Sequence, residues 1–116
     1  LFTYAYATQL LQARALQTAI EAHRLQEKCM GTLPWQFNDA WPGISWSVVD
    51  YYGRPKAGFY ALKHLYATLL PVLQANGDSL EIVLSSHLLA DSAATLLLEL
   101  WQPGGRYRQG VRRVVI

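Results

Sequence analysis

The sequence predicts an α+β fold in which a helix, a short strand and a second helix are followed by antiparallel strands. Apolar residues recur at helical spacing over the first part of the chain, whereas alternating segments and Gly-rich turns occupy the last part. With 116 residues, 52% of them hydrophobic, the chain has enough apolar material for a small core. The change of pattern falls at Pro71, so we expect residues 1–70 and residues 71–116 to belong to two domains.

The first predicted element is a long amphipathic helix over residues 2–28. No Gly or Pro interrupts it, and its Ala, Leu and Gln residues favour a helix. The apolar stripe consists of Tyr6, Leu10, Ala13, Leu16, Ile20 and His23. The opposite face carries Gln9, Gln12, Arg14, Gln17, Glu21 and Arg24.

A buried strand is predicted for residues 32–37, a short apolar run after Gly31, although Pro34 removes one backbone donor. Residues 38–53 lack a period and predict a long loop. Loops of that length in compact domains are usually functional or disordered, and the many aromatic residues argue against disorder. Asp50 and Arg54 are spaced to form an ion pair that fixes this loop, though an exposed pair contributes little stability.

Pro55 occupies the position expected for the first residue of a second helix, which we predict to run to residue 68 and to end before Pro71. Turns are predicted at Asn76-Gly77-Asp78 and at Pro103-Gly104-Gly105. Alternating apolar residues then predict three strands, at residues 80–84, 95–101 and 107–116.

The segment from Met30 to Arg54 holds three of the four tryptophans, together with amides, carboxylates and an arginine. Aromatic rings stack on the C–H face of a sugar, while short polar side chains bond its hydroxyls. We therefore interpret this segment as the rim of a carbohydrate site. Its candidate residues are Trp35, Gln36, Asn38, Asp39 and Trp46.

Several other functions are disfavoured by composition. The net charge is +2, and four arginines near the end alternate with other residues as on a solvated strand face, so we expect no nucleic-acid partner. These are Arg106, Arg108, Arg112 and Arg113. One cysteine excludes an internal disulfide, and no apolar run has the length of a membrane span. No targeting signal is present, so no compartment is predicted and no membrane partner is expected.

A metal site or bound cofactor is also not expected. The three histidines, His23, His64 and His87, have no Cys, Asp or Glu at ligand spacing around them. The sequence has no Gly-rich phosphate loop and no Ser or Cys nucleophile motif.

The residues from Gly31 to Pro42, with Ser45-Trp46-Ser47 and residues 50–57, resemble the β-mannosidase branch of glycoside hydrolase family 2. The resemblance extends back to Gln9 and forward to Glu99, nearly the whole chain. Two positions depart from the family's pattern: Pro34, where a large apolar residue is usual, and Ala40, where cysteine is common. Neither removes a group expected to touch sugar.

The resemblance implies that residues 1–70 are the last helix–strand–helix segment of a (β/α)₈ barrel. Residues 71–116 would be the first antiparallel strands of an immunoglobulin-like β-sandwich. Barrel sites lie where strands end, so Trp35 would be a platform under the sugar or, alternatively, a core aromatic. Gln36, Asn38 and Asp39 would bond hydroxyls or hold the loop, and Trp46 would line an outer subsite or pack the loop.

The activity implied by the resemblance is that of a retaining exo-β-mannosidase, which hydrolyses terminal non-reducing β-D-mannose with two glutamates. In the family these lie on the fourth and seventh barrel strands, which would precede Leu1. Glu21, Glu27, Glu81 and Glu99 match no catalytic motif, so we expect no catalytic residue in this chain. Its partners would be a β-mannoside oligosaccharide and the upstream barrel segment. The alternative is a non-catalytic carbohydrate-binding or interaction module.

Overall fold

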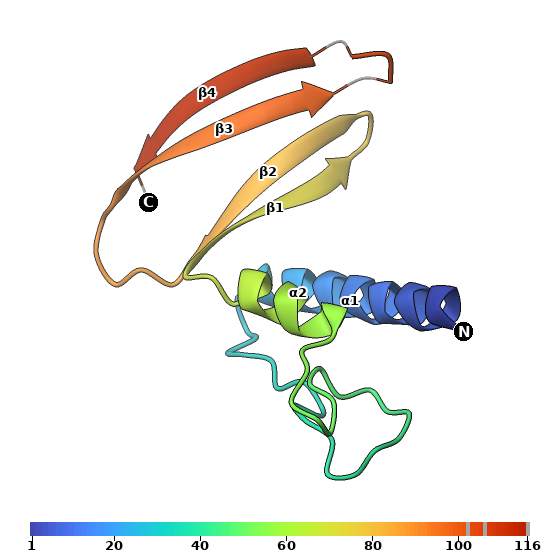
Figure 1. Ribbon diagram of the computed structural model, residues 1–116. Helices are drawn as coiled ribbons and strands as arrows, with labels where there is room; N and C mark the ends of the chain where they lie inside the picture. Colours follow the sequence, from blue (N-terminus) through green and yellow to red (C-terminus); the bar gives the residue numbers. More distant parts are fainter. Residues whose placement is uncertain (102, 106, 116) are drawn as a thin grey trace. The chain divides into compact units, whose positions relative to one another are not determined.

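The computed structural model describes residues 1–101, 103–105 and 107–115, which form two helices and four strands (Figure 1). The strands form two antiparallel hairpins, β1–β2 and β3–β4. The α+β composition predicted from the sequence is therefore confirmed. The elements are α1 (Phe2–Arg24), α2 (Ala57–Leu65), β1 (Leu69–Asn76), β2 (Ser79–Ser86), β3 (Ala93–Trp101) and β4 (Tyr107–Val115).

The chain divides into two compact units, Leu1–Ser85 and Ser86–Ile116. The first contains both helices, the loop of residues 38–53, here called the aromatic loop, and the β1–β2 hairpin except its last residue. The second contains the β3–β4 hairpin. No helix in the described part of the chain combines the length and apolar character needed to cross a bilayer.

Helix α1 ends at Arg24, four residues before the predicted end. The amide of Leu25 still bonds the carbonyl of Glu21 at 3.2 Å, and that of Gln26 bonds His23 at 3.2 Å, which closes the last turn. Leu25 then packs against the hydrophobic core instead of continuing the helix. His23 and Arg24 place basic side chains in the last turn, where the helix dipole favours positive charge.

The prediction of a strand at residues 32–37 is wrong. This segment is irregular, and its nearest ladder contact is an isolated bridge between Asn38 and Val49. A buried strand needs a hydrogen-bonding neighbour, and the described residues place no strand beside this one. Leu33, Trp35 and Phe37 are consequently 97%, 78% and 60% exposed rather than buried.

Helix α2 begins at Ala57, not at Pro55, and ends at Leu65. Pro55 forms an isolated bridge with Val49, and Lys56 has extended backbone angles at the N-cap position. Pro71 does not end the helix but lies inside β1, a strand that the sequence did not predict. Because β1 has a single partner strand, a residue without an N–H is tolerated on its free edge.

The strands predicted after Pro71 are confirmed as β2, β3 and β4, with residue 116 outside the described residues. Gly77, at a φ of 58°, makes the predicted turn between β1 and β2. β3 and β4 pair in register from Ala93↔Val115 to Trp101↔Tyr107. Of the four arginines predicted on a solvated strand, Arg112 is exposed and Arg106 lies outside the described residues.

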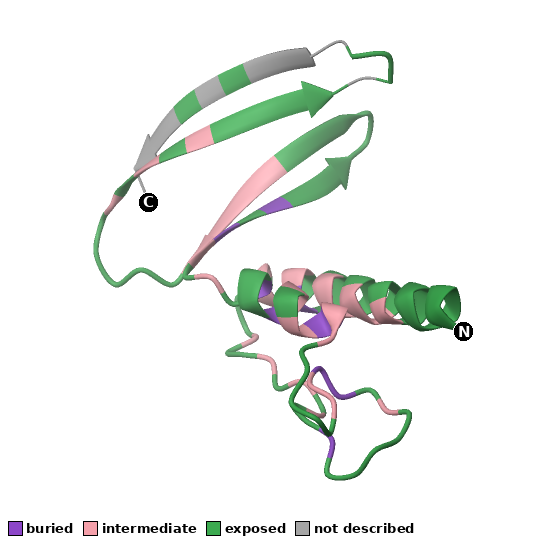
Figure 2. Ribbon diagram, viewed as in Figure 1, coloured by how far each residue is buried: buried purple, intermediate pink, exposed green. Residues whose placement is uncertain are grey.

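The core is small and joins the C-terminal half of α1, α2, the loop and β1 (Figure 2). Its buried residues are Ile20, Val48, Leu62, Leu65, Leu70 and Val72. Gly58 lets the helices approach closely, since a Cβ there would lie 3.1 Å from Val48 and 3.2 Å from Leu16. The N-terminal half of the predicted apolar stripe is not covered: Tyr6 and Leu10 remain exposed.

Candidate functional site

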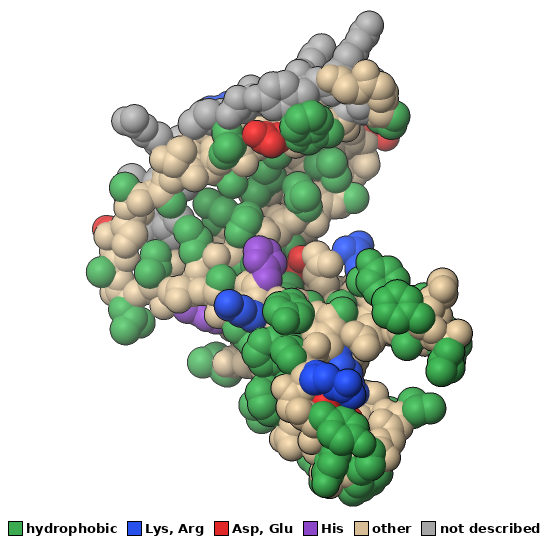
Figure 3. Space-filling model, viewed as in Figure 1, with side chains coloured by type: hydrophobic (Ala, Val, Ile, Leu, Met, Phe, Trp, Pro, Cys, Tyr) green, Lys and Arg blue, Asp and Glu red, His purple; other side chains and the backbone are tan. Residues whose placement is uncertain are grey.

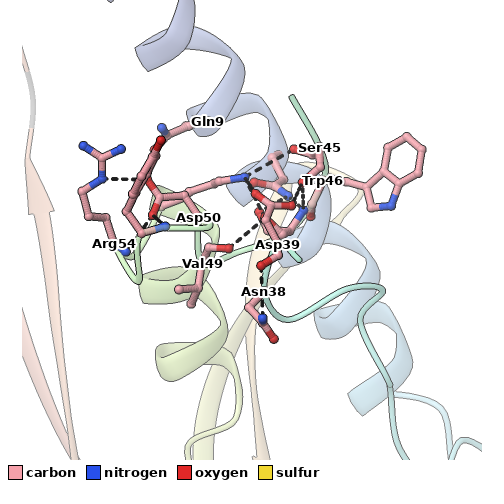
Figure 4. A network of polar contacts seen from close by, with 12 residues as sticks. Gln9, Asn38, Asp39, Ser45, Trp46, Val49, Asp50 and Arg54 are labelled. Atoms are coloured by element: carbon pink, nitrogen blue, oxygen red, sulfur yellow. Dashed lines mark hydrogen bonds and ion pairs between the residues drawn. The ribbon is translucent and has the colours of Figure 1, made fainter. Parts of the chain in front are cut away.

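The aromatic loop is held by a buried polar network centred on Asp39 and Lys56 (Figure 4). Asp39 is 7% exposed, and its carboxylate accepts hydrogen bonds from the Ser45 hydroxyl and, at 3.3 Å, from the Lys56 Nζ. Lys56 Nζ also donates to the Ser47 hydroxyl at 2.7 Å. Ser47 is fully buried and donates in turn to the carbonyl of Val49 at 2.9 Å. The network therefore joins both ends of the loop to the start of α2.

Backbone hydrogen bonds close the base of the same loop. The amide of Asp39 donates to the carbonyl of Val49 at 3.1 Å. The amides of Val48 and Val49 both donate to the carbonyl of Phe37, at 3.1 and 2.9 Å. The amide of Lys56 donates to Val48 at 2.9 Å. These hydrogen bonds hold three segments together at the base of the loop: residues 37–39, 48–49 and 56.

Two glutamines of α1 extend the network. Gln12 Nε2 donates to the carbonyl of Trp46 and, at 3.5 Å, to that of Ser47. Gln9 Oε1 accepts from the amide of Ala57 at 3.0 Å and so satisfies one free N–H at the start of α2. The sequence placed both glutamines on the solvent face of α1, whereas the structure turns them toward the loop.

The charge of Asp39 is stabilised where it lies. The hydrogen bond from Ser45 is the largest influence and lowers the pKa of Asp39; desolvation raises it, and Ser47 and Lys56 lower it further. The net pKa is below the ordinary value, so Asp39 is a carboxylate at neutral pH. It is therefore a fixed acceptor rather than a proton donor.

The predicted ion pair between Asp50 and Arg54 is confirmed, with 2.7 Å between Oδ2 and Nε. Asp50 Oδ1 also accepts from the amides of Tyr52 and Arg54, each at 2.9 Å. The backbone hydrogen bond from Arg54 is the main cause of a lowered pKa of Asp50. Arg54 is 72% exposed, so this pair shapes a turn more than it adds stability.

The five predicted site residues fall into two environments. Trp35 and Trp46 are 78% and 66% exposed, and the Trp46 indole points away from the polar network (Figure 4). Asn38 is exposed and donates to the carbonyl of Asp39 at 3.3 Å, while Gln36 is half-buried after a cis Trp35–Gln36 peptide. Asp39 is buried with its carboxylate engaged by Ser45 and Lys56. Four of the five are thus accessible, and one is committed to the loop.

Sequence reasoning missed the partners that hold the loop. Ser45, Ser47 and Lys56 belong to the segments that carry the resemblance, but the sequence analysis assigned no role to any of them. Lys56 is the N-cap residue of α2 and makes no side-chain capping hydrogen bond. The sequence did not indicate this position, because the helix was predicted to begin at Pro55.

Two hollows adjoin the loop. An apolar one of about 340 Å³ is lined by residues that include Leu33, Phe37, Phe59 and Leu62. The other, of about 580 Å³, lies between the N-terminal half of α1 and the loop, and is lined in part by Tyr4, Gln9, Gln12, Trp46, Asp50 and Lys56. Figure 3 shows hydrophobic side chains on the surface of the unit Leu1–Ser85. The second hollow combines aromatic faces with polar groups, as a carbohydrate site requires.

Three of the four glutamates lie on separate elements, and Glu27 lies in the turn region after α1. Glu21 on α1 accepts from Gln17 Nε2 at 2.7 Å, and Glu81 on β2 accepts from Asn76 Nδ2 at 2.6 Å. Glu99 lies on β3. Among the described residues, no group of three His, Cys, Asp or Glu side chains is arranged to hold a metal ion.

Known proteins similar to this chain are β-mannosidases. Beta-mannosidase B of Aspergillus flavus is 47% identical over 64 residues, which are 52% of this chain and 8% of that protein. The beta-mannosidase of Bos taurus is 36% identical over 103 residues, 82% of this chain and 12% of the relative. No family model matches the chain.

The solved structure of a β-D-mannosidase from Dictyoglomus thermophilum superposes with a TM-score of 0.69 at 25% identity. It covers 96% of this chain, which corresponds to 15% of that protein. The chain spans only 8–12% of the length of the curated relatives above. The predicted resemblance is confirmed: this chain is similar to one segment of the β-mannosidases.

Proposed function

We propose that this chain is a segment of a retaining exo-β-mannosidase that hydrolyses terminal non-reducing β-D-mannose residues. The main support for the proposal is the similarity to β-mannosidases over most of the chain. The loop with exposed tryptophans, which a buried polar network holds in place, is consistent with it. In this proposal residues 1–70 complete a (β/α)₈ barrel and residues 71–116 begin an immunoglobulin-like sandwich. Because the matched segment is only 8–12% of each relative's length, most of the site belongs to the rest of the protein.

The catalytic glutamates are proposed to lie upstream of this chain. Retaining hydrolysis needs two carboxyl groups about 5–5.5 Å apart on opposite sides of the scissile bond. Glu21 and Glu81 lie on a helix and a hairpin, and each accepts a hydrogen bond from a neighbouring side-chain amide. The contribution of this chain is therefore binding and positioning, not proton transfer.

We assign Trp35 as the platform beneath the reacting sugar and Trp46 as an outer contact. Both indoles are exposed, which leaves their faces free to stack on a pyranose ring. Gln36 and Asn38, beside Trp35 in the sequence, would bond its hydroxyls. Asp39 is assigned to loop support, because its carboxylate already accepts from Ser45 and Lys56.

Exposed apolar side chains support a partner segment from the same protein. Leu33 and Phe37 are 97% and 60% exposed and line the apolar hollow of about 340 Å³. Their alternation with half-buried Thr32, Pro34 and Gln36 is the pattern of a strand with one face uncovered. Neighbouring barrel strands would supply both the missing ladder and the cover.

Hydrolysis by the full-length protein tests the proposal. We expect cleavage of an aryl β-mannoside in preference to the matching β-galactoside and β-glucuronide, with β-mannose as the first product detected by proton NMR. An α-anomeric first product would contradict the retaining mechanism. Absence of hydrolysis, with mannan binding by a stably folded 116-residue chain, would favour the non-catalytic binding module instead.

A further inference from the structure

The backbone of Trp46 is fixed on both sides. The preceding Ser45 donates its hydroxyl hydrogen to Asp39 and accepts from the amide of Ser47 at 3.0 Å. The carbonyl of Trp46 itself accepts from Gln12 on α1. Few conformations of the tryptophan backbone satisfy all of these bonds at once.

Lys56 is the shared partner of these groups. Its Nζ lies 3.3 Å from Asp39 Oδ2, 2.7 Å from the Ser47 hydroxyl and 3.5 Å from the carbonyl of Ser45, so its three donors have three acceptors. The Lys56 side chain is 14% exposed and that of Asp39 is 5% exposed. Removing the cation would leave a nearly buried carboxylate without its counter-charge, which is costly in a desolvated site.

The Trp46 side chain contrasts with this buried base. Its indole is 66% exposed, points away from the network in Figure 4, and lines the hollow of about 580 Å³ next to α1. Trp46 is not among the described residues packed against the core of this segment, so hydrogen bonds of its backbone, rather than burial of its ring, order it here. A rigid backbone lowers the entropy cost of stacking a ligand on the ring.

We propose that Lys56 is a positioning residue that holds Trp46 ready to stack on a sugar beyond the reacting one. This inference rests on the function proposed above. Lys56 also lines the hollow of about 580 Å³, but its Nζ donors are engaged by Asp39, the carbonyl of Ser45 and Ser47. We therefore assign its effect to the loop that these groups hold rather than to a hydrogen bond with the ligand. This proposal predicts that replacing Lys56 and replacing Trp46 raise KM to the same extent.

A double-mutant cycle in the full-length protein tests this. The variants are Lys56→Met, Trp46→Ala and the combination, assayed on a β-linked manno-oligosaccharide. We expect each single change to raise KM about five- to tenfold, as for a lost stacking contact, with kcat within about twofold of the wild type. The combined variant should have the KM of either single variant, because both remove one and the same interaction.

Arg54→Met is the matched control, because it removes a cation of the same segment whose side chain is 72% exposed. Hydrogen exchange gives a readout that is independent of activity. Lys56→Met should speed exchange of the amides of residues 39–49, and Arg54→Met should not. Ser45→Ala, a smaller change in the same network, should act like Lys56→Met if that variant folds poorly.

Multiplied KM effects in the combined variant would overturn the inference, since Lys56 would then act independently of Trp46. Unchanged exchange in Lys56→Met would overturn it as well. Both results leave the proposed hydrolysis intact. A wild-type protein that cleaves no β-mannoside would instead overturn the proposed function, and this inference with it.

Discussion

Arg24, in the last turn of α1, donates from Nη1 to the carbonyl of Leu65, the last residue of α2, at 2.8 Å. The same nitrogen donates to the carbonyl of Ala67 at 2.6 Å, and the rest of the guanidinium reaches Ser85 on β2 at 3.1 Å. Its acceptors are carbonyls and a hydroxyl, and burial lowers its pKa. One side chain thus ties two helices and a hairpin together.

Replacing Arg24 with Met should destabilise this unit by about 2–4 kcal/mol, because several carbonyls at the end of α2 lose a charged donor. Arg14→Met is the matched control, since the Arg14 guanidinium on the same helix donates to the Gln17 side chain and not to a carbonyl of α2. Thermal denaturation of the full-length protein measures both. Equal melting temperatures for the two variants would show that the Arg24 contacts do not contribute to stability.

Stability should also depend on pH through Asp39. Its folded-state pKa is lowered, first by Ser45, so its contribution is fully present above the unfolded value of about 4 and is lost as pH falls through the folded value. We expect the melting temperature of the full-length protein to drop below about pH 4. Asp39→Asn should lower it at pH 7 and show a smaller further drop in acid. Parallel curves for the two proteins would mean that Asp39 does not carry this dependence.

The local elements were largely predictable from the sequence. Strands β2, β3 and β4 and the turn at Gly77 were predicted from patterns of a few neighbouring residues, such as alternating apolar side chains. The structure confirms these elements. β1 was missed because Pro71 was interpreted as a terminator, although a strand with one free edge accepts proline. Residues 32–37 were predicted as a strand from their composition, but a strand also requires a partner, which composition does not supply.

The polar base of the site could not be predicted, since its bonds join distant residues. Asp39 and Lys56 are 17 positions apart, and Gln12 and Trp46 are 34 apart. The candidate list therefore contained exposed tryptophans together with one buried carboxylate, and it omitted the lysine that pairs with it. The residue types indicated a sugar site. Which residues are exposed to a ligand and which hold the loop could be seen only in the structure.

Trp35→Ala in the full-length protein should lower kcat/KM on an aryl β-mannoside by about 2–4 kcal/mol of transition-state stabilisation, because stacking at the distorted sugar is lost. Trp35 is 78% exposed and lies outside the core of this segment, so the melting temperature should fall less than for a tryptophan fully buried in a core. Trp101→Ala is the control: the same indole, 66% exposed, on β3 of the other unit. A collapsed melting temperature with retained kcat/KM would make Trp35 a packing residue.

We propose that this chain supplies binding and loop geometry to a β-mannosidase whose catalytic glutamates lie elsewhere in the protein. The most direct measurement compares hydrolysis of an aryl β-mannoside by the purified 116-residue chain and by the full-length protein. We expect turnover by the full-length protein and none by the 116 residues at any pH, because the acid and the nucleophile are proposed to lie outside this chain. Turnover by the short chain within about a hundredfold of the full-length rate, a gap of only ~2.7 kcal/mol, would contradict this proposal and show that a glutamate of this chain catalyses.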